Sequence, residues 1–473
     1  MKGLRGDLLI TLGAHLLTKP LWLIIDNLIQ DRLGHEVYGL IGALHSFALW
    51  ANVVADWSFS YYITRQVAQA PHQLRAIASE TLLPKLFLSS LTWGAFLLLG
   101  YLIGYAQQHL WWLAGLLAYQ IALALIQYFR SFFQGIQLFR ADAFLGNAEK
   151  LVIILLILSL WGHISGTLYV GVLASGGLIA LVGIAAWAWR QFGPWHCQME
   201  AATTSTLLRR LMPYTLLVLV SGVNERINQV LIERLSGPYE NGLYLGAYRW
   251  FGASMMYLWI VLPIFYARFA ALGHQPTPML WRTFLMGQLT AALPLLAVTL
   301  VMFVEPDVFL ILFQHSTAPE IFKMASVLQI LSLAGTLNAT FNIYSTHITA
   351  NHRERVSLGI TGLSLIANLL WSWWGIPRYG AMAGGVGLLV SYSIFSVGHY
   401  LFFQRWVRLA RPAGTLPWRL LGIWLGTGLS LHLLRPYVPP LPKGLWGAAA
   451  VGVFGVVLYL MGTLHLWRRV SRL

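Results

Sequence analysis

Ionisable side chains inside long apolar stretches are the residues of this sequence that could do chemistry. Near the N-terminus, His15, Lys19 and Asp26 are spaced i, i+4 and i+11, which places them on one face of a helix. Each such group costs about 2.5–3.5 kcal/mol to insert into a bilayer, so it should face a partner or a water-filled cavity. We expect this face to line a cavity, with Lys19 as the first candidate to bind an anion. The alternative is a paired or snorkelling Lys19, with Pro20 as a simple kink.

A second polar cluster lies in the stretch NERINQ at residues 224–229. Asn224 and Asn228 of this stretch share one helix face. Arg226, together with Arg249 of the next apolar stretch, is a candidate to receive a phosphate on the outward side. A polar cluster of this kind must face protein or water rather than lipid. The alternative is a structural ion pair of Arg226 with Glu225 or Glu233.

Six charged residues are candidates for gating or coupling, and Asp26 of the first apolar stretch is one of them. Asp56 and Arg65 flank the inner end of the second apolar stretch, where they would form a gate with Arg268 or anchor the helix at the interface. Arg130 and Glu149 form another candidate set. Burial favours the neutral form of a carboxylate, so Glu149 is a candidate proton-coupling group. The alternative is a structural Arg130–Glu149 salt bridge.

Two further polar residues share a face in a later apolar stretch. Asn338 and Asn342 are candidates to bind sugar hydroxyls or to cross-link helices. The sequence shows no pair of closely spaced histidines with a nearby acid, so we expect no metal site. The single cysteine, Cys197, excludes an intrachain disulfide and a cysteine-based metal cluster.

The elements that must position these residues are membrane-spanning helices. The chain has 473 residues, of which 58% are hydrophobic and 10% charged, with a mean hydropathy of +0.65. Soluble domains have about 25% charged residues. Apolar windows long enough to cross a bilayer recur throughout, so the sequence predicts an all-α polytopic membrane protein. The fourteen expected spans are 7–30, 38–62, 82–104, 110–134, 143–162, 166–190, 210–232, 242–270, 281–304, 321–347, 355–375, 381–405, 416–434 and 445–467.

The net charge of +15 indicates orientation rather than nucleic-acid binding. With both termini on the cytoplasmic side, 21 of the 31 Lys and Arg residues fall on that side, six fall on the other, and four lie within spans. Lys85 and Lys150 are assigned to the cytoplasmic connections in this count. The bias follows the positive-inside rule. We therefore expect a multi-pass membrane protein with both termini cytoplasmic.

The chain repeats itself with a shift of 203 residues. The aligned pairs are Gly34 with Gly237, Gly39 with Gly242, Leu40 with Leu243, and Arg65 with Arg268. The repeat predicts an N-terminal lobe of six helices at 1–205, a C-terminal lobe of six at 206–410, and two further helices at 411–473. Because each copy has an even number of spans, both have the same orientation, an arrangement typical of transporters that work by alternating access.

Three stretches resemble bacterial polysaccharide flippases. LGHEVYGLIGALHSF with ADWSFSYYITRQVA resembles the start of these proteins, and NERINQVLIERLSGPYENGLYLGAYRW resembles the opening of their second lobe. ANLLWSWWGIPRYGAMAGGVGLLVSY resembles their junction of helices eleven and twelve, and the resemblance covers residues 5–405. One departure is that the usual glycine after the aspartate of the second span is replaced in DWSFS. The family is the polysaccharide transporter (O-antigen and oligosaccharidyl-lipid flippase) branch of the multidrug/oligosaccharidyl-lipid/polysaccharide (MOP) exporter superfamily.

This resemblance implies a MATE-like fold and a place in the bacterial cytoplasmic (inner) membrane. It also implies translocation of an undecaprenyl-pyrophosphate-linked oligosaccharide across that membrane by alternating access, for O-antigen, capsule or exopolysaccharide synthesis. It implies no cofactor, with coupling to an H⁺ or Na⁺ gradient or to the membrane potential. Expected partners are the lipid-linked glycan, the bilayer, and a polymerase and glycosyltransferases, with the chain itself a monomer. The alternatives on the same fold are a multidrug or organic-cation antiporter and a lipid II flippase. An enzyme would need a large extramembrane loop or an acidic catalytic motif, and the sequence indicates neither.

Overall fold

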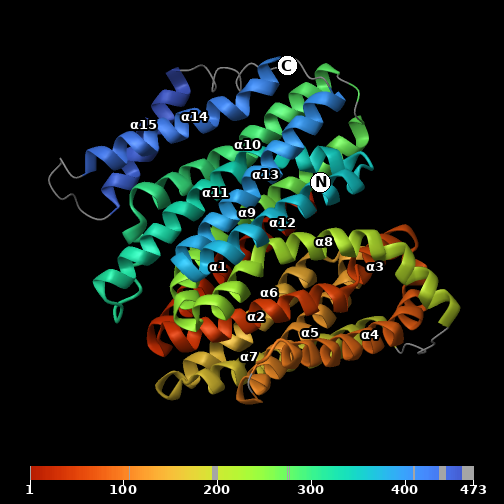
Figure 1. Ribbon diagram of the computed structural model, residues 1–473. Coiled ribbons are helices and arrows are strands. Elements are labelled where there is room, and N and C mark those ends of the chain that lie inside the picture. The colour runs from red at the N-terminus through yellow and green to blue at the C-terminus, as the bar shows by residue number, and fades with distance from the viewer. Residues whose placement is uncertain are drawn as a thin grey trace. The chain divides into compact units, whose positions relative to one another are not determined.

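The computed structural model describes residues 2–105, 107–193, 201–273, 275, 277–407, 411–435 and 444–460. Within these ranges the regular structure is helical, and Figure 1 shows the helices in chain order. The α-helices are α1 (Lys2–Leu33), α2 (His35–Asp56), α3 (Phe59–Gln69), α4 (Leu74–Leu102), α5 (Gln107–Gly135), α6 (Phe139–Ser159), α7 (Gly166–Phe192), α8 (Ala201–Ser236), α9 (Pro238–Leu272), α10 (Pro278–Val304), α11 (Ala318–Ala350), α12 (Glu354–Tyr379), α13 (Ala381–Val407), α14 (Arg411–Leu434) and α15 (Leu445–Leu460). Three short 3₁₀ helices are η1 (Pro71–Gln73), η2 (Trp161–His163) and η3 (Pro306–Val308).

The helices confirm the predicted fold class. In the described part of the chain, ten helices are long and apolar enough to cross a membrane, with α2 and α3 counted together. Helices suit this environment because their backbone hydrogen bonds are satisfied within the segment, where lipid offers no partners. The predicted second span differs in detail, since it is broken between α2 and α3 at Trp57 and Ser58.

The helix α12 shows how the sequence sorts its residues between protein and lipid. Its buried face carries small polar residues three or four positions apart: Ser357, Thr361, Ser364, Asn368 and Ser372. Its exposed face carries Leu363, Ile366, Leu370 and Trp373. Small residues let α12 pack closely against α13, its main partner. The large apolar residues face outward, as a lipid solvent requires.

Contacts divide the chain into two compact units, residues 1–230 (unit 1) and 231–473 (unit 2), and the division falls within α8. In unit 1, α5 packs against α2, α4 and α7, and α6 packs against α7. In unit 2, α11 packs against α9, α10 and α13, and α12 packs against α13. The same packing pattern therefore occurs twice, as the repeat requires. The lobe boundaries at 205 and 410 remain a prediction.

The repeated corner has the same backbone geometry in both units. Gly34 precedes α2 with φ 78° and ψ 161°, and Gly237 precedes α9 with φ 93° and ψ 164°. This region of backbone space is accessible in practice only to glycine. The paired glycines of the sequence are thus explained by a turn that no other residue makes without strain.

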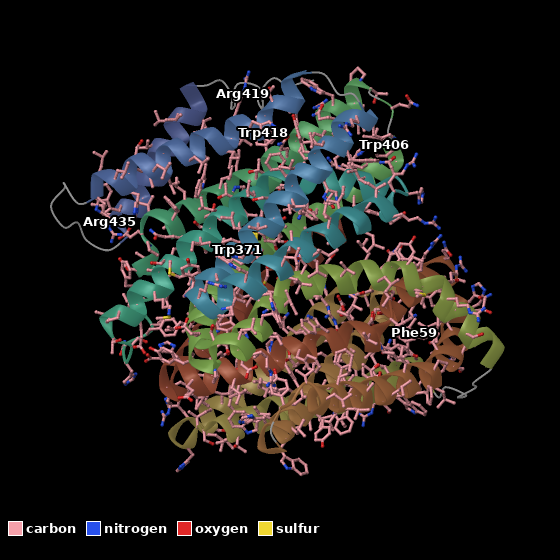
Figure 2. The ribbon with its side chains drawn as sticks, viewed as in Figure 1. Phe59, Trp371, Trp406, Trp418, Arg419 and Arg435 are labelled. Carbon is pink, nitrogen blue, oxygen red and sulfur yellow. The ribbon has the colours of Figure 1, made fainter. Side chains whose placement is uncertain are left out.

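The C-terminal helices α14 and α15 belong to unit 2 and pack against α10. The Glu305 carboxylate, after the end of α10, accepts hydrogen bonds from the backbone N–H groups of Gly444 at 2.7 Å and Gly447 at 2.8 Å. Arg435 follows α14 and donates to the Val304 carbonyl and to Asp307 (Figure 2). These contacts attach the end of α14 and the start of α15 to the same end of α10.

Candidate functional site

Unit 1 contains a cavity of about 80 Å³ between α1, α2, α5, α6 and α7. Its charged and aromatic lining residues are Trp22, Asp26, Tyr38, His45, Tyr119, Lys150 and Tyr169. The charged side chains of Asp26 and Lys150 would be costly against lipid, so their gathering within a helical unit marks a polar interior. The cavity is therefore the candidate site.

The acidic side of the cavity is held by two phenols. Asp26 on α1 is 9% exposed, and its Oδ1 accepts hydrogen bonds from Tyr38 on α2 at 2.7 Å and from Tyr169 on α7 at 2.8 Å. The centroids of the two tyrosine rings lie 6.2 Å apart. Three helices thus converge on one carboxylate, which fixes its position and compensates for its burial.

The basic side of the cavity is a three-residue cluster of Tyr119, Glu149 and Lys150. The Lys150 ammonium lies 3.3 Å from the Glu149 carboxylate and donates to the Tyr119 hydroxyl at 3.0 Å. The same hydroxyl donates to Glu149 at 2.5 Å. Lys150 Nζ also lies 4.2 Å from the ring centroid of Trp22, within the range of a cation–π contact. The cluster presents a cation and an aromatic face to the cavity.

His45 on α2 lines the cavity near both its acidic side and its basic side. Its ring stacks on Tyr119 at a centroid distance of 6.0 Å, and its Nε2 lies 2.9 Å from the Gln120 amide nitrogen. This contact joins α2 with α5. Arg226 on α8 lies close enough to His45 to act on it electrostatically, as do Asp26 and Lys150.

This combination of groups can bind a neutral polar ring or a small anion. Aromatic faces, a carboxylate acceptor and an ammonium donor are the groups that hydroxyls and phosphate oxygens need. Sites for drug-sized molecules measure about 300–1,000 Å³. A cavity of about 80 Å³ is smaller, so it admits one edge of a larger headgroup and not a whole oligosaccharide.

The sequence of the chain matches one known protein family. The family model described as "Polysaccharide biosynthesis protein" matches residues 4–269, more than half of the chain. The chain belongs to the polysaccharide biosynthesis protein family. No curated protein matches it.

Solved structures show that this family member has the fold of the MOP superfamily transporters. The structure described as lipid II flippase MurJ in an inward closed conformation has a TM-score of 0.71, with 12% identity, over 98% of this chain and 100% of that one. A multidrug resistance MATE family transporter in an inward-facing conformation has a TM-score of 0.65, with 15% identity, over 85% of this chain and 98% of that one. A MOP superfamily transporter from Pyrococcus furiosus has a TM-score of 0.62, with 15% identity, over 86% of this chain and 95% of that one. The fold of this chain is that of these membrane transporters.

The first predicted site of this family member falls partly on the cavity. Asp26 lines it, whereas Lys19 is exposed on α1 and is not among the described lining residues. Lys19 nevertheless precedes Trp22 and Asp26 by three and seven positions, so it shares their helix face. The His15 side chain lies outside the described residues, as does Cys197. The role of Lys19 in binding an anion remains a prediction.

The predicted second anion site is divided between the two units. Asn224 and Asn228 are buried in α8, and Arg226 is half-buried there, whereas Arg249 is half-buried in α9 of unit 2. Glu233, one alternative partner of Arg226, forms an ion pair with Arg234 at 3.2 Å. The joint action of Arg226 and Arg249 therefore remains a prediction.

The later asparagine pair is adjacent, as its spacing predicts. In unit 2, Asn342 donates to the Asn338 side-chain oxygen at 2.8 Å, and Asn338 donates to the sulfur of Met255 at 3.6 Å. The pair thus links α11 with α9. Its binding of sugar hydroxyls remains a prediction.

The gating residues have different partners from those expected. Asp56 forms an ion pair with Lys85 at 3.1 Å, and Arg65 is exposed. Arg268 is also exposed, with its guanidinium 5.8 Å from the ring centroid of Phe265 in the same helix. The gate of Asp56, Arg65 and Arg268 remains a prediction.

The alternative of an Arg130–Glu149 salt bridge is wrong. Arg130 donates to both carboxylate oxygens of Asp142, at 2.7 and 3.2 Å, and Gln134 donates to the same carboxylate at 3.2 Å. Glu149 instead pairs with Lys150. Asp142 lies twelve positions after Arg130, beyond the turn between α5 and α6. This turn brings the Asp142 carboxylate within hydrogen-bond distance of the Arg130 guanidinium.

Two lysines were not among the predicted site residues. Lys150 and Lys85, which the charge count assigned to cytoplasmic connections, lie within α6 and α4, and Lys85 is 0% exposed. Counting Lys150 within its apolar stretch, directly after Glu149, would have identified a mid-span pair. The aromatic residues of the cavity gave no such signal, because tyrosine and tryptophan are abundant throughout the chain.

Proposed function

We propose that this protein is a flippase that moves an undecaprenyl-pyrophosphate-linked oligosaccharide across the bacterial inner membrane by alternating access. The supporting observation is the cavity of unit 1, which combines aromatic faces with Asp26 and Lys150 in a chain of the polysaccharide biosynthesis family. A glycan headgroup needs these groups to replace the hydration that it loses in the membrane. Both termini are cytoplasmic in this proposal, and an ion gradient or the membrane potential drives the cycle.

The helix α1 offers the headgroup two neighbouring places. Lys19 is exposed one turn before Trp22, which lines the cavity, so the two residues are about 4.5 Å apart along the helix axis. An anionic pyrophosphate at Lys19 would place an attached sugar within reach of Trp22 and Asp26. Arg226 and Arg249 are proposed as further phosphate contacts during the cycle.

Two other functions on the same fold are less well supported. An organic cation would meet the Lys150 ammonium, and the lining carboxylate Asp26 already accepts two phenol hydroxyls. Lipid II shares the polyprenyl-pyrophosphate chemistry, and the similarity to the lipid II flippase structure makes it the second candidate. The two glycan functions differ in the pathway that supplies the substrate, with a polymerase and glycosyltransferases as partners of the first.

Deletion of the gene in its host tests the proposal. We expect surface polysaccharide to be lost while its lipid-linked precursor accumulates, because precursor synthesis continues on the cytoplasmic side. Reintroduced Asp26→Asn and Lys150→Met variants should restore less than about a tenth of the polysaccharide, and the exposed control Arg419→Gln should restore it fully. Accumulation of lipid II with intact surface polysaccharide would favour the second candidate. Unchanged glycans together with sensitivity to organic cations would contradict both.

A further inference from the structure

The joint between α2 and α3 holds two consecutive non-glycine residues in the left-handed helical region. Trp57 has φ 45° and ψ 34°, and Ser58 has φ 58° and ψ 18°. Side chains with a Cβ are sterically strained in this region, and such strain persists only where the surroundings enforce it. Residues 35–69 would otherwise form one continuous apolar helix. The strained joint therefore needs neighbouring groups that hold it.

A fully buried lysine stabilises the broken form of the helix. Lys85 on α4 donates to the Ala55 carbonyl at 2.9 Å and to the Asp56 carboxylate at 3.1 Å. Its Nζ also lies 5.9 Å from the ring centroid of Phe59, the first residue of α3 (Figure 2). In an unbroken helix the Ala55 carbonyl would instead accept the N–H of Phe59. Lys85 thus supplies a donor to a carbonyl that the break leaves without its helical partner.

The joint is attached to α8 by three side-chain contacts. The Trp57 indole donates to the Leu208 carbonyl at 3.0 Å, and the Ser58 hydroxyl lies 3.1 Å from that of Thr215. One turn further along, the rings of Tyr61 and Tyr214 stack at a centroid distance of 5.9 Å. All these contacts lie within unit 1.

The stretch of α8 that contacts the joint contains a proline, at which the helix can bend. Pro213 lies inside α8, between Leu208 and Thr215. A proline within a helix removes one backbone hydrogen bond and is a usual site of bending. Two deformable segments, the joint and the turn at Pro213, therefore face each other and are held together by side chains. The division between the two units falls further along the same helix.

We propose that the α2–α3 joint is a latch on α8, and that each transport cycle requires its release. While Trp57 and Ser58 hold α8, their left-handed conformation and the turn at Pro213 are fixed. When the contacts of Trp57 with Leu208 and of Ser58 with Thr215 break, Trp57 and Ser58 can return to right-handed helix geometry and α8 can bend at Pro213. The strain makes release easier than it would be from a relaxed turn. The proposal rests on the transport function proposed above for its role in a cycle, but not for the latch itself.

A reversible cross-link tests whether release is required. In a Cys197→Ser background, Ser58→Cys with Thr215→Cys places two thiols across the latch. The matched control is Thr299→Cys with Thr336→Cys, whose native hydroxyls lie 3.0 Å apart between α10 and α11. We expect oxidation to lower surface-polysaccharide export at least tenfold in the latch pair only, and reduction to restore it. Undiminished export by the oxidised latch pair, or an equal loss in the control pair, would overturn the proposal.

Hydrogen exchange of the purified full-length chain tests the latch without any substrate. Trp57→Phe removes the indole donor, and we expect the amides just after Pro213 to exchange about fivefold faster, the factor for one net hydrogen bond. The matched control is Trp93→Phe, which removes an indole bond of 3.2 Å to the Ala114 carbonyl. Unchanged exchange near Pro213 in Trp57→Phe, or the same increase there in Trp93→Phe, would refute the latch. If both cysteine-pair variants export no glycan even when reduced, while hydrogen exchange near Pro213 is faster in Trp57→Phe, then the proposed function fails and the latch stands.

Discussion

Removing one partner of the buried Lys85–Asp56 pair should destabilise the protein, and the two single changes should differ in size. Loss of one member of a buried ion pair costs about 3–5 kcal/mol, because the other charge is left uncompensated. Lys85→Met leaves Asp56, whose side chain is 22% exposed and keeps the hydroxyl of Ser60 at 2.6 Å. Asp56→Asn leaves Lys85, whose side chain is 0% exposed. We therefore expect about 3 kcal/mol for Lys85→Met and about 4 kcal/mol for Asp56→Asn.

The double variant distinguishes an ion pair from two independent contacts. With both charges removed, the main remaining cost is the Ala55 carbonyl without its donor, about 1–3 kcal/mol. The double variant should therefore be less destabilised than either single variant, about 2 kcal/mol in all. Equilibrium unfolding in mixed micelles, followed by tryptophan fluorescence, measures all three. A double variant destabilised by the sum of the single changes, or a Lys85→Met variant that is less stable than Asp56→Asn, would refute this reasoning.

Two further predictions concern unit 2. Gly380 has φ 55°, and a Cβ there would lie against the Glu240 carboxylate, so Gly380→Ala should lower the free energy of unfolding by about 2 kcal/mol. Gly359 lies in open space on α12, so the control Gly359→Ala should raise the free energy of unfolding by up to about 1 kcal/mol. Equal effects of the two changes in thermal unfolding would contradict the strain at Gly380. Glu305→Gln weakens the acceptor of the Gly447 and Gly444 N–H groups. Because hydrogen bonds to charged groups contribute about 1.5–3 kcal/mol, amides at the start of α15 should exchange about tenfold faster in this variant. Unchanged hydrogen exchange would show that the carboxylate does not hold this helix.

The sequence predicted the helices and the repeated corner because general physical rules determine both. Lipid requires backbone hydrogen bonds within each segment, so apolar length alone indicates a helix. Gly34 and Gly237 were informative because only glycine adopts their conformation. Asp26 was found by its helical spacing with Lys19, since one face of a helix is a local property.

The sequence could not predict partners that depend on packing between helices. Nothing local indicates that Arg130 bonds to Asp142 instead of Glu149, because the choice depends on the turn between α5 and α6. The break at Trp57 was also hidden, since neither Trp57 nor Ser58 is a residue that favours a turn with positive φ. Lys150 was misplaced because the charge count assigned it to a connection although it lies inside the predicted span 143–162.

Transfer of a lipid-linked glycan by the purified chain in liposomes tests the central claim most directly. Undecaprenyl-pyrophosphate-linked glycan from the host is incorporated into the vesicles, and the fraction accessible to an external glycosidase is followed over time. The account predicts transfer by the wild-type chain, at least a tenfold lower rate for Lys150→Met, and an unchanged rate for Arg419→Met, an exposed cation on α14 (Figure 2). No transfer by the wild-type chain, or equal rates for Lys150→Met and wild type, would contradict it.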